Sequence, residues 1–203
     1  MSRSPASRRR IALVGLAALL LGVWGASGVG TAADRLTVHA STDAPIRVLR
    51  DDDRVWNVVR FDPGGEVELR LPIVQRGPLP VTIDDARLTR RARTDRCGWA
   101  IDEVELLRDG ARTALRPGGD SVRLGRGQDA ELRIAGRFTG EPGCLPAATP
   151  TSRGAAYLDI AVAGLARQQR VPLPEVLTWS TDPASSADRF ARSPTAPRVG
   201  SPA

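Results

Sequence analysis

Few side chains in this sequence have the types and spacing that catalysis requires. His39 is the only histidine and Met1 the only methionine, which disfavours copper sites and other metal centres that need several histidines. Ser-His-Asp catalysis through His39 is not supported, because no G-x-S-x-G motif accompanies it. The glycine-rich loops that bind phosphate are also missing. We therefore expect no metal site, no cofactor and no catalytic residue, and the sequence predicts a protein that is not an enzyme.

Carboxylates offer the main alternative chemistry. Asp84, Asp85 and Asp102 are candidates for a hydrolase that acts on envelope material through two carboxyl groups. That mechanism requires the two groups to lie within ~10 Å of each other in a cleft. The DDD run at residues 51–53 lacks the spacing and the fixed glycine of a calcium loop, and is more typical of a solvated turn.

A cluster of arginines is the strongest candidate for binding. Its members, all within ten residues, are Arg87, Arg90, Arg91, Arg93 and Arg96. Arginine binds phosphate and carboxylate oxygens through paired hydrogen bonds, so the cluster predicts contact with an envelope protein or an anionic surface. Acidic residues between positions 95 and 105 leave open that these arginines are neutralised within the fold. Nucleic acid is not an expected partner, because aromatic residues make up only 4% of the chain.

Tryptophans leave a third possibility open. Trp56 or Trp179 on the surface, beside polar groups, is what a lectin-like carbohydrate binder needs. Packing in the core, together with Trp99, is the alternative interpretation.

Two cysteines are present, Cys97 and Cys144. In an exported domain two cysteines usually pair, and neither a Cys-x-x-Cys motif nor an activating partner suggests redox chemistry. We expect a disulfide that ties two loops at one end of the fold.

The N-terminal segment directs the chain to the envelope. Residues 1–10 form a basic region with Arg8-Arg9-Arg10, and residues 11–33 carry no charge. Small residues near Ala33 are typical of a cleaved signal peptide, yet a segment of this length also spans the ~30 Å core of a bilayer as a helix. Either way, residues 1–10 are predicted to be cytoplasmic, residues 11–33 a signal peptide or transmembrane anchor, and everything after Asp34 extracytoplasmic, membrane-anchored or secreted.

Alternating apolar residues predict strands through most of the remaining chain. The clearest segment is 66–88, where Val67 to Ile73 alternate, a Gly-Pro turn follows, and the alternation resumes at Val81. We interpret this segment as a hairpin, with Pro72 placing its first strand at an edge or a bulge. Nine or so short strands predict an all-β, two-sheet, immunoglobulin-like sandwich over residues 34–179. Residues 180–203 are predicted to be a disordered tail.

The strand and turn from Gly64 to Ile83, with Tyr157 to Ile160 and the closing Val171-Pro172-Leu173-Pro174, resemble a known group. These are uncharacterised exported or membrane-anchored immunoglobulin-like β-sandwich proteins of high-GC actinobacteria. The resemblance implies a non-enzymatic interaction or accessory module at the cell envelope. Trp99 follows Cys97 by only two residues, which departs from the antibody-type arrangement of a tryptophan between two bridged cysteines.

Overall fold

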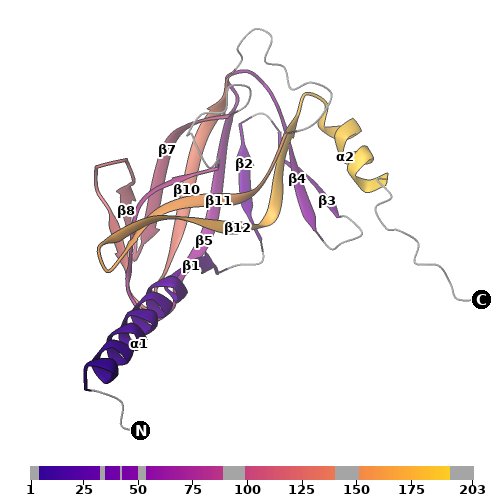
Figure 1. Ribbon diagram of the computed structural model, residues 1–203. Coiled ribbons are helices and arrows are strands. Elements are labelled where there is room, and N and C mark those ends of the chain that lie inside the picture. The colour runs from indigo at the N-terminus through magenta and orange to yellow at the C-terminus, as the bar shows by residue number, and fades with distance from the viewer. Residues whose placement is uncertain are drawn as a thin grey trace, which may run out of the picture.

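The computed structural model describes residues 5–32, 35–41, 43–49, 54–88, 99–139 and 151–192. Two β-sheets pack face to face, with one helix leaving the sandwich at the N-terminus and a second, short helix near the C-terminus (Figure 1). The prediction of an all-β, two-sheet sandwich after an N-terminal helix is confirmed. The immunoglobulin-like strand order stays a prediction.

Among the described residues, each sheet has six strands. Sheet A contains β1 (Gly28–Thr31), β2 (Thr37–Ala40), β5 (Glu66–Arg76), β7 (Trp99–Arg108), β8 (Ala111–Ala114) and β10 (Asp129–Phe138). Its order is β1-β5-β10-β7-β8, and β2 also pairs with β5. Sheet B contains β3 (Ile46–Leu49), β4 (Val55–Arg60), β6 (Val81–Arg87), β9 (Val122–Leu124), β11 (Thr151–Val162) and β12 (Leu165–Ser180). Its order is β3-β4-β12-β11-β6-β9, and β12 runs parallel to β4.

The hairpin prediction for residues 66–88 is wrong. Both segments are strands, but β5 belongs to sheet A and β6 to sheet B, so the turn between them crosses from one sheet to the other. Alternate residues of both strands, among them Leu69, Ile73 and Ile83, are buried between the sheets. Alternation shows that a strand has one buried face, but it does not show which strand lies beside it.

The position of Pro72 also differs from the prediction, because β5 is an interior strand. β10 pairs continuously along one side of it. On the other side β1 pairs with residues 73–76 and β2 with residues 67–70, so Pro72 lies at the gap between them. Its carbonyl accepts a hydrogen bond from the Ala32 amide at 2.9 Å. The missing N–H of proline therefore faces a break in the ladder, where no partner strand requires it.

The two ends of the sandwich domain lie outside the predicted limits of 34–179. Helix α1 (Pro5–Ala26) ends well before Ala33, and the chain then enters sheet A as β1. At the other end, residues predicted to be a disordered tail form helix α2 (Pro183–Arg192), which packs against β3 and β4. Ser186 and Ala187 are buried there, so the segment has a small apolar contact that its composition did not reveal. Residues 193–203 lie outside the described part of the chain.

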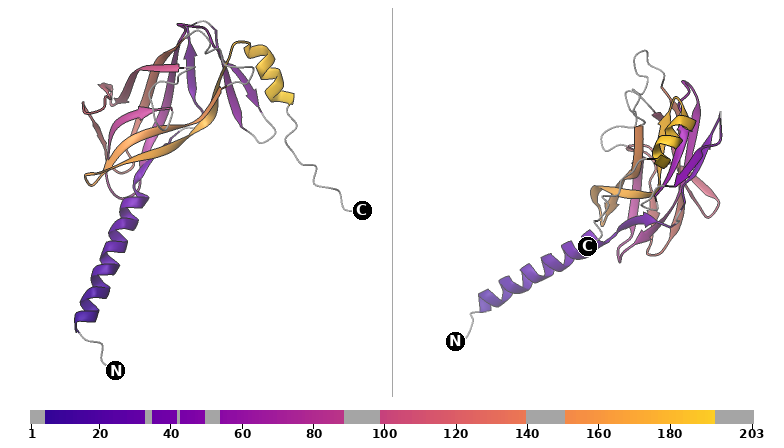
Figure 2. Two further views of the ribbon diagram at one scale, coloured as in Figure 1. Left: turned by 45° about the horizontal axis from the view of Figure 1, so that its top comes forward. Right: turned by 90° about the vertical axis from the view of Figure 1, so that its right-hand side faces the viewer.

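Helix α1 projects from one end of the sandwich and contacts it only near its own C-terminus, as Figure 2 shows in two further views. Its described leucines are exposed, including Leu19, Leu20 and Leu21 at 63%, 58% and 64%. Within the described residues, no helix combines the length and the apolar content needed to span a membrane.

Candidate functional site

The outer face of sheet A carries a network of opposite charges. Because alternate residues of β5 and β10 face the core, Glu68, Arg70 and Arg133 must point to the outside. The strand register places Arg133 opposite Arg70 on one side and opposite Glu105 on the other. Two arginines that face each other across strands would repel, so the site depends on the carboxylates between them.

Arg133 is the centre of this network. Its Nε donates to Glu68 Oε2 at 2.8 Å. Its Nη1 donates to Glu103 and Glu105 at 2.7 Å each. The second oxygen of Glu68 accepts from Arg70 Nε at 2.6 Å. Three carboxylates therefore enclose one guanidinium, and Glu68 bridges the two facing arginines.

These contacts determine the protonation states. Burial by itself would raise the pKa of Glu68, but hydrogen bonds and charge attraction from Arg133 and Arg70 outweigh it and lower that pKa. The hydrogen bonds that Arg133 donates to Glu68 and Glu105 raise the pKa of Arg133. Glu68 is thus held as a carboxylate at neutral pH and is unsuited to act as a general acid.

An open hollow with a cavity volume of about 410 Å³ adjoins the network. Its polar lining comprises His39, Ser41, Glu66, Glu68, Asp102, Glu103 and Arg133. Acidic residues outnumber basic ones in this lining, so the hollow favours donors of hydrogen bonds and positive groups over anions. Within the described ranges, no group of three or more His, Cys, Asp or Glu residues is arranged to hold a metal ion.

Polar groups in the hollow already have structural partners. Asp102 accepts two hydrogen bonds from Arg137, at 3.0 and 3.2 Å. The Ser41 hydroxyl accepts one from the Glu66 amide at 2.9 Å. His39 is exposed on β2, on the outer face that alternation predicted. The arrangement resembles a surface that is fixed in shape and charge more than a set of reactive groups.

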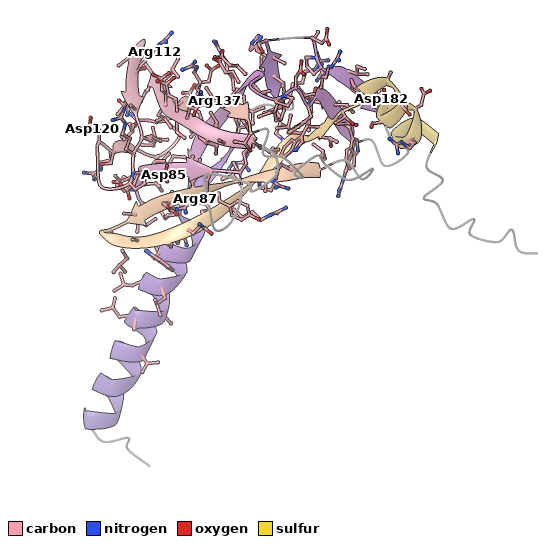
Figure 3. The ribbon with its side chains drawn as sticks, turned by 90° about the horizontal axis from the view of Figure 1, so that it is seen from above. Asp85, Arg87, Arg112, Asp120, Arg137 and Asp182 are labelled. Atoms are coloured by element: carbon pink, nitrogen blue, oxygen red, sulfur yellow. The ribbon has the colours of Figure 1, made fainter. Side chains whose placement is uncertain are left out.

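The structure does not bring together the carboxylates of the hydrolase hypothesis. Asp102 is exposed on β7 of sheet A, whereas Asp84 and Asp85 belong to β6 of sheet B. Figure 3 shows Asp85 and Arg87 over one sheet and Arg137, the partner of Asp102, over the other. Asp102 therefore belongs to another sheet than Asp84 and Asp85, which are neighbours on β6.

Of the predicted arginine cluster, only Arg87 is described. It forms an ion pair with Asp159 on β11, the strand beside it. Arg87 therefore already has an ion-pair partner within the fold. Arg90, Arg91, Arg93 and Arg96 lie outside the described residues, so a binding role for them stays a prediction.

Cys97 and Cys144 also lie outside the described residues, and their disulfide stays a prediction. The strands that flank them are informative. Trp99, at the start of β7, is the register partner of Phe138, at the end of β10. Described residues close in sequence to the two cysteines therefore lie side by side, at the end of the sandwich away from α1 (Figure 1).

Two of the tryptophans are buried and unavailable to a carbohydrate. Trp99 and Trp179 are 3% and 1% exposed and belong to the main core. Trp56 is half-buried and packs against a small cluster of Val48, Val58 and Ala187 beneath α2. The lectin hypothesis is therefore wrong for Trp179, because a buried indole has no face available for a sugar.

The junction between α1 and the sandwich was missed by sequence reasoning. The side chain of Gln169 on β12 brackets Val29 on β1: its oxygen accepts from the Val29 amide at 3.0 Å, and its nitrogen donates to the Val29 carbonyl at 2.7 Å. Ser27, at the end of α1, is buried and accepts a hydrogen bond from the Leu79 amide at 3.1 Å. These contacts fix the chain between the helix and sheet A.

Arginine and tryptophan complete the junction. The Arg167 guanidinium lies over the Trp24 ring, 4.5 Å from its centroid, and donates a hydrogen bond to the Ser27 carbonyl. A cation at the C-terminal end of a helix also interacts favourably with the helix dipole. No local signal in the sequence predicted this junction, since its members are about 140 residues apart.

The comparisons with known proteins add little. No protein-family model matches the chain, and no curated protein matches it. Three solved structures align at 10% identity: the VesB protease of Vibrio cholerae (TM-score 0.33, 69% of this chain and 32% of that one), a family 123 glycoside hydrolase from Clostridium perfringens (0.32, 71% and 26%) and the N-terminal domain of PorA (0.27, 72% and 98%). The chain spans about a third of the protease and about a quarter of the hydrolase. Likenesses at this level carry no argument about function.

Proposed function

We propose that this protein is a non-enzymatic β-sandwich module of the cell envelope, held at the membrane by an N-terminal helix that is not removed. One observation carries the proposal: the residues that follow α1 form an integral strand of sheet A. β1 pairs with β5 over four residues, and Val29 is buried in the main core. The segment that resembles a cleavage region is thus part of the domain.

Cleavage near Gly30 to Ala33 would remove β1 from the folded protein. The Gln169 amide would lose both of its contacts with Val29, and the β5 edge from Ile73 to Arg76 would lose its partner. Unpaired backbone groups and an empty apolar position are each costly. The fold therefore favours the retained anchor over the cleaved signal peptide.

Lipid is the partner that fits the exposed surface of α1. The helix is 22 residues long, and its uncharged part, residues 11–26, measures about 24 Å at 1.5 Å per residue. Its described leucines have no protein side chain covering them, and Arg8-Arg9-Arg10 near its N-terminus match the positive charge that cytoplasmic flanks carry. On this orientation the sandwich lies on the extracytoplasmic side.

The absence of a visible reaction centre in the described residues supports an interaction or accessory role. Three of the four carboxylates of the hollow, Glu68, Glu103 and Asp102, are held by arginines, and Asp102 lies on another sheet than Asp84 and Asp85. What remains is a rigid, charged surface on a fixed stalk, which suits contact with an envelope component.

Alkaline carbonate extraction of membranes, combined with protease added to spheroplasts, tests the proposal. The full chain should stay in the membrane pellet, and its sandwich should be digested from outside. Leu19→Arg with Leu20→Arg should abolish membrane retention. Ile46→Arg with Leu49→Arg, which adds the same charges at exposed positions of β3, should not. Recovery of the parent chain in the soluble fraction would contradict the proposal.

A further inference from the structure

We name the end of the sandwich that surrounds the C-terminus of α1 the proximal end. It consists of the strand ends and turns at residues 76–80, 108–112, 123–129 and 163–167. Contacts join these segments to α1 and to one another. Gly77 approaches Ala26, Arg167 covers Trp24, the Gly127 amide donates to the Gln75 carbonyl, and Arg108 donates to the Arg123 carbonyl.

Arginine dominates the charge of the proximal end. Its basic residues are Arg76, Arg108, Arg112, Arg123, Arg126 and Arg167, and its acidic residues are Asp109 and Asp129. Asp109 is already paired with Arg108 at 3.0 Å. In the described part of the chain, no ion pair involves the exposed Arg123 or Arg126. The proximal end therefore presents a surplus of positive charge that the protein itself does not neutralise.

The geometry of α1 places this charge at the level of lipid headgroups. Leu19, Leu20 and Leu21 lie five to seven residues before Ala26, so the exposed apolar surface begins ~8–10 Å from the end of the helix. Headgroup layers extend roughly 5–8 Å beyond the hydrocarbon on each side of a bilayer. Trp24, at the end of α1, is a residue type that suits this interface.

We propose that the proximal end binds the phosphate groups of anionic lipids through Arg123, Arg126 and their basic neighbours. The guanidinium forks match phosphate oxygens in pairs. The inference rests on the proposed function, since it requires α1 to lie in the bilayer, and it adds a ligand class and a surface that the anchor alone does not specify. Lipid binding here would hold the sandwich in one orientation above the membrane.

Spin-labelled lipids test the inference with the full chain reconstituted in bilayers. Electron paramagnetic resonance measures the preference of the protein for labelled phosphatidylglycerol over labelled phosphatidylcholine. The parent should prefer phosphatidylglycerol, and the preference should fall as salt is added. Each arginine removed should reduce it by about fivefold.

The variants are matched in charge. Arg123→Ser with Arg126→Ser should lose most of the preference, whereas Arg60→Ser with Arg137→Ser, two exposed arginines away from the proximal end, should retain it. Equal association of both lipids with the parent, or equal losses in both variants, would overturn this inference alone. Failure of the parent to enter bilayers of either composition would overturn the proposed function as well, and the inference with it.

Discussion

The outer face of sheet A and the proximal end are both rich in arginine, but the arginines meet different partners. On sheet A, Arg133 is enclosed by Glu68, Glu103 and Glu105. At the proximal end, Arg123 and Arg126 are exposed, whereas Arg76 and Arg167 donate to backbone carbonyls. Arginine therefore neutralises carboxylates on the outer face of sheet A. At the proximal end, Arg167 secures the end of α1, whereas Arg123 and Arg126 remain available for the proposed ligand. Which of these an arginine does depends on strand register and not on how many arginines the sequence contains.

The largest effect is expected for a substitution that strains the backbone of the proximal end. Gly77 has a φ of 101°, and a Cβ there would lie 2.5 Å from the Ala26 carbonyl oxygen. Gly77→Ala should lower the free energy of unfolding by about 3 kcal/mol, from backbone strain and displacement of α1 together. Urea unfolding of the full chain in mild detergent measures this.

Gly64→Ala is the matched control, because Gly64 has a φ of 80° but nothing within 4 Å of its added Cβ. It should cost only about 1 kcal/mol, from strain. Equal losses in the two variants would show that the approach of α1 to Gly77 is unimportant.

A somewhat smaller effect is expected on the outer face of sheet A. Arg133→Met leaves three neighbouring carboxylates without their common donor and should cost about 2 kcal/mol. Arg137→Met removes an arginine that is 62% exposed and should change stability by no more than ~0.5 kcal/mol. If both variants lost the same small amount, the network would be a set of ordinary surface ion pairs.

The two hydrogen bonds between the Gln169 side chain and Val29 join β12 to β1, and removing them sharpens the comparison. Gln169→Ala removes an acceptor for the Val29 amide and a donor to its carbonyl, and should cost about 1.5 kcal/mol. The neighbouring Gln168 is exposed, so Gln168→Ala should cost less than ~0.5 kcal/mol. Hydrogen exchange of β1 amides should speed up only in the Gln169 variant.

A pH series separates the charged network from packing. The arginines lower the pKa of Glu68 below its ordinary value of 4.5, so its stabilising contribution is complete above that value and is lost as pH falls through the lowered pKa. In Arg133→Met the clustered carboxylates repel one another, and protonation relieves that repulsion. The stability gap between parent and variant should therefore narrow by about 1 kcal/mol or more between pH 7 and pH 3. A gap independent of pH would indicate lost packing instead.

The smallest effect is expected for the unpaired arginines. Arg123→Ser with Arg126→Ser should change the free energy of unfolding by less than ~0.5 kcal/mol, although it removes as much positive charge as Arg133 and Arg137 carry together. Differential scanning fluorimetry is sufficient to detect a departure. A clear destabilisation would mean that these side chains serve the fold and would weaken the case for a lipid site.

The sequence predicted the two-sheet architecture because alternation, as in Val67 to Ile73, depends only on one face being buried. It did not predict that β5 and β6 lie in different sheets, since a Gly-Pro turn permits either path. The strand Gly28–Thr31 was not predicted for a related reason: small residues suit a cleavage site and also suit a strand that packs closely against Gln169 and Arg76.

Only part of the candidate site could be predicted from the sequence. The outward direction of Glu68 and Arg133 follows from alternation, but 65 positions separate them, and only the register of β5 and β10 brings them together. The carboxylates of the hydrolase hypothesis show the same limit, because Asp102 is near Asp84 and Asp85 in sequence but belongs to the other sheet.

The most direct test of the account is the intact mass of the protein isolated from the membranes of an expressing cell, with its N-terminus identified by peptide sequencing. The account predicts a chain that still contains α1 and β1, from the first residues through Ala32. A mature N-terminus between Gly30 and Asp34 on a stably folded protein would contradict it, because β1 would then be dispensable and the stalk absent.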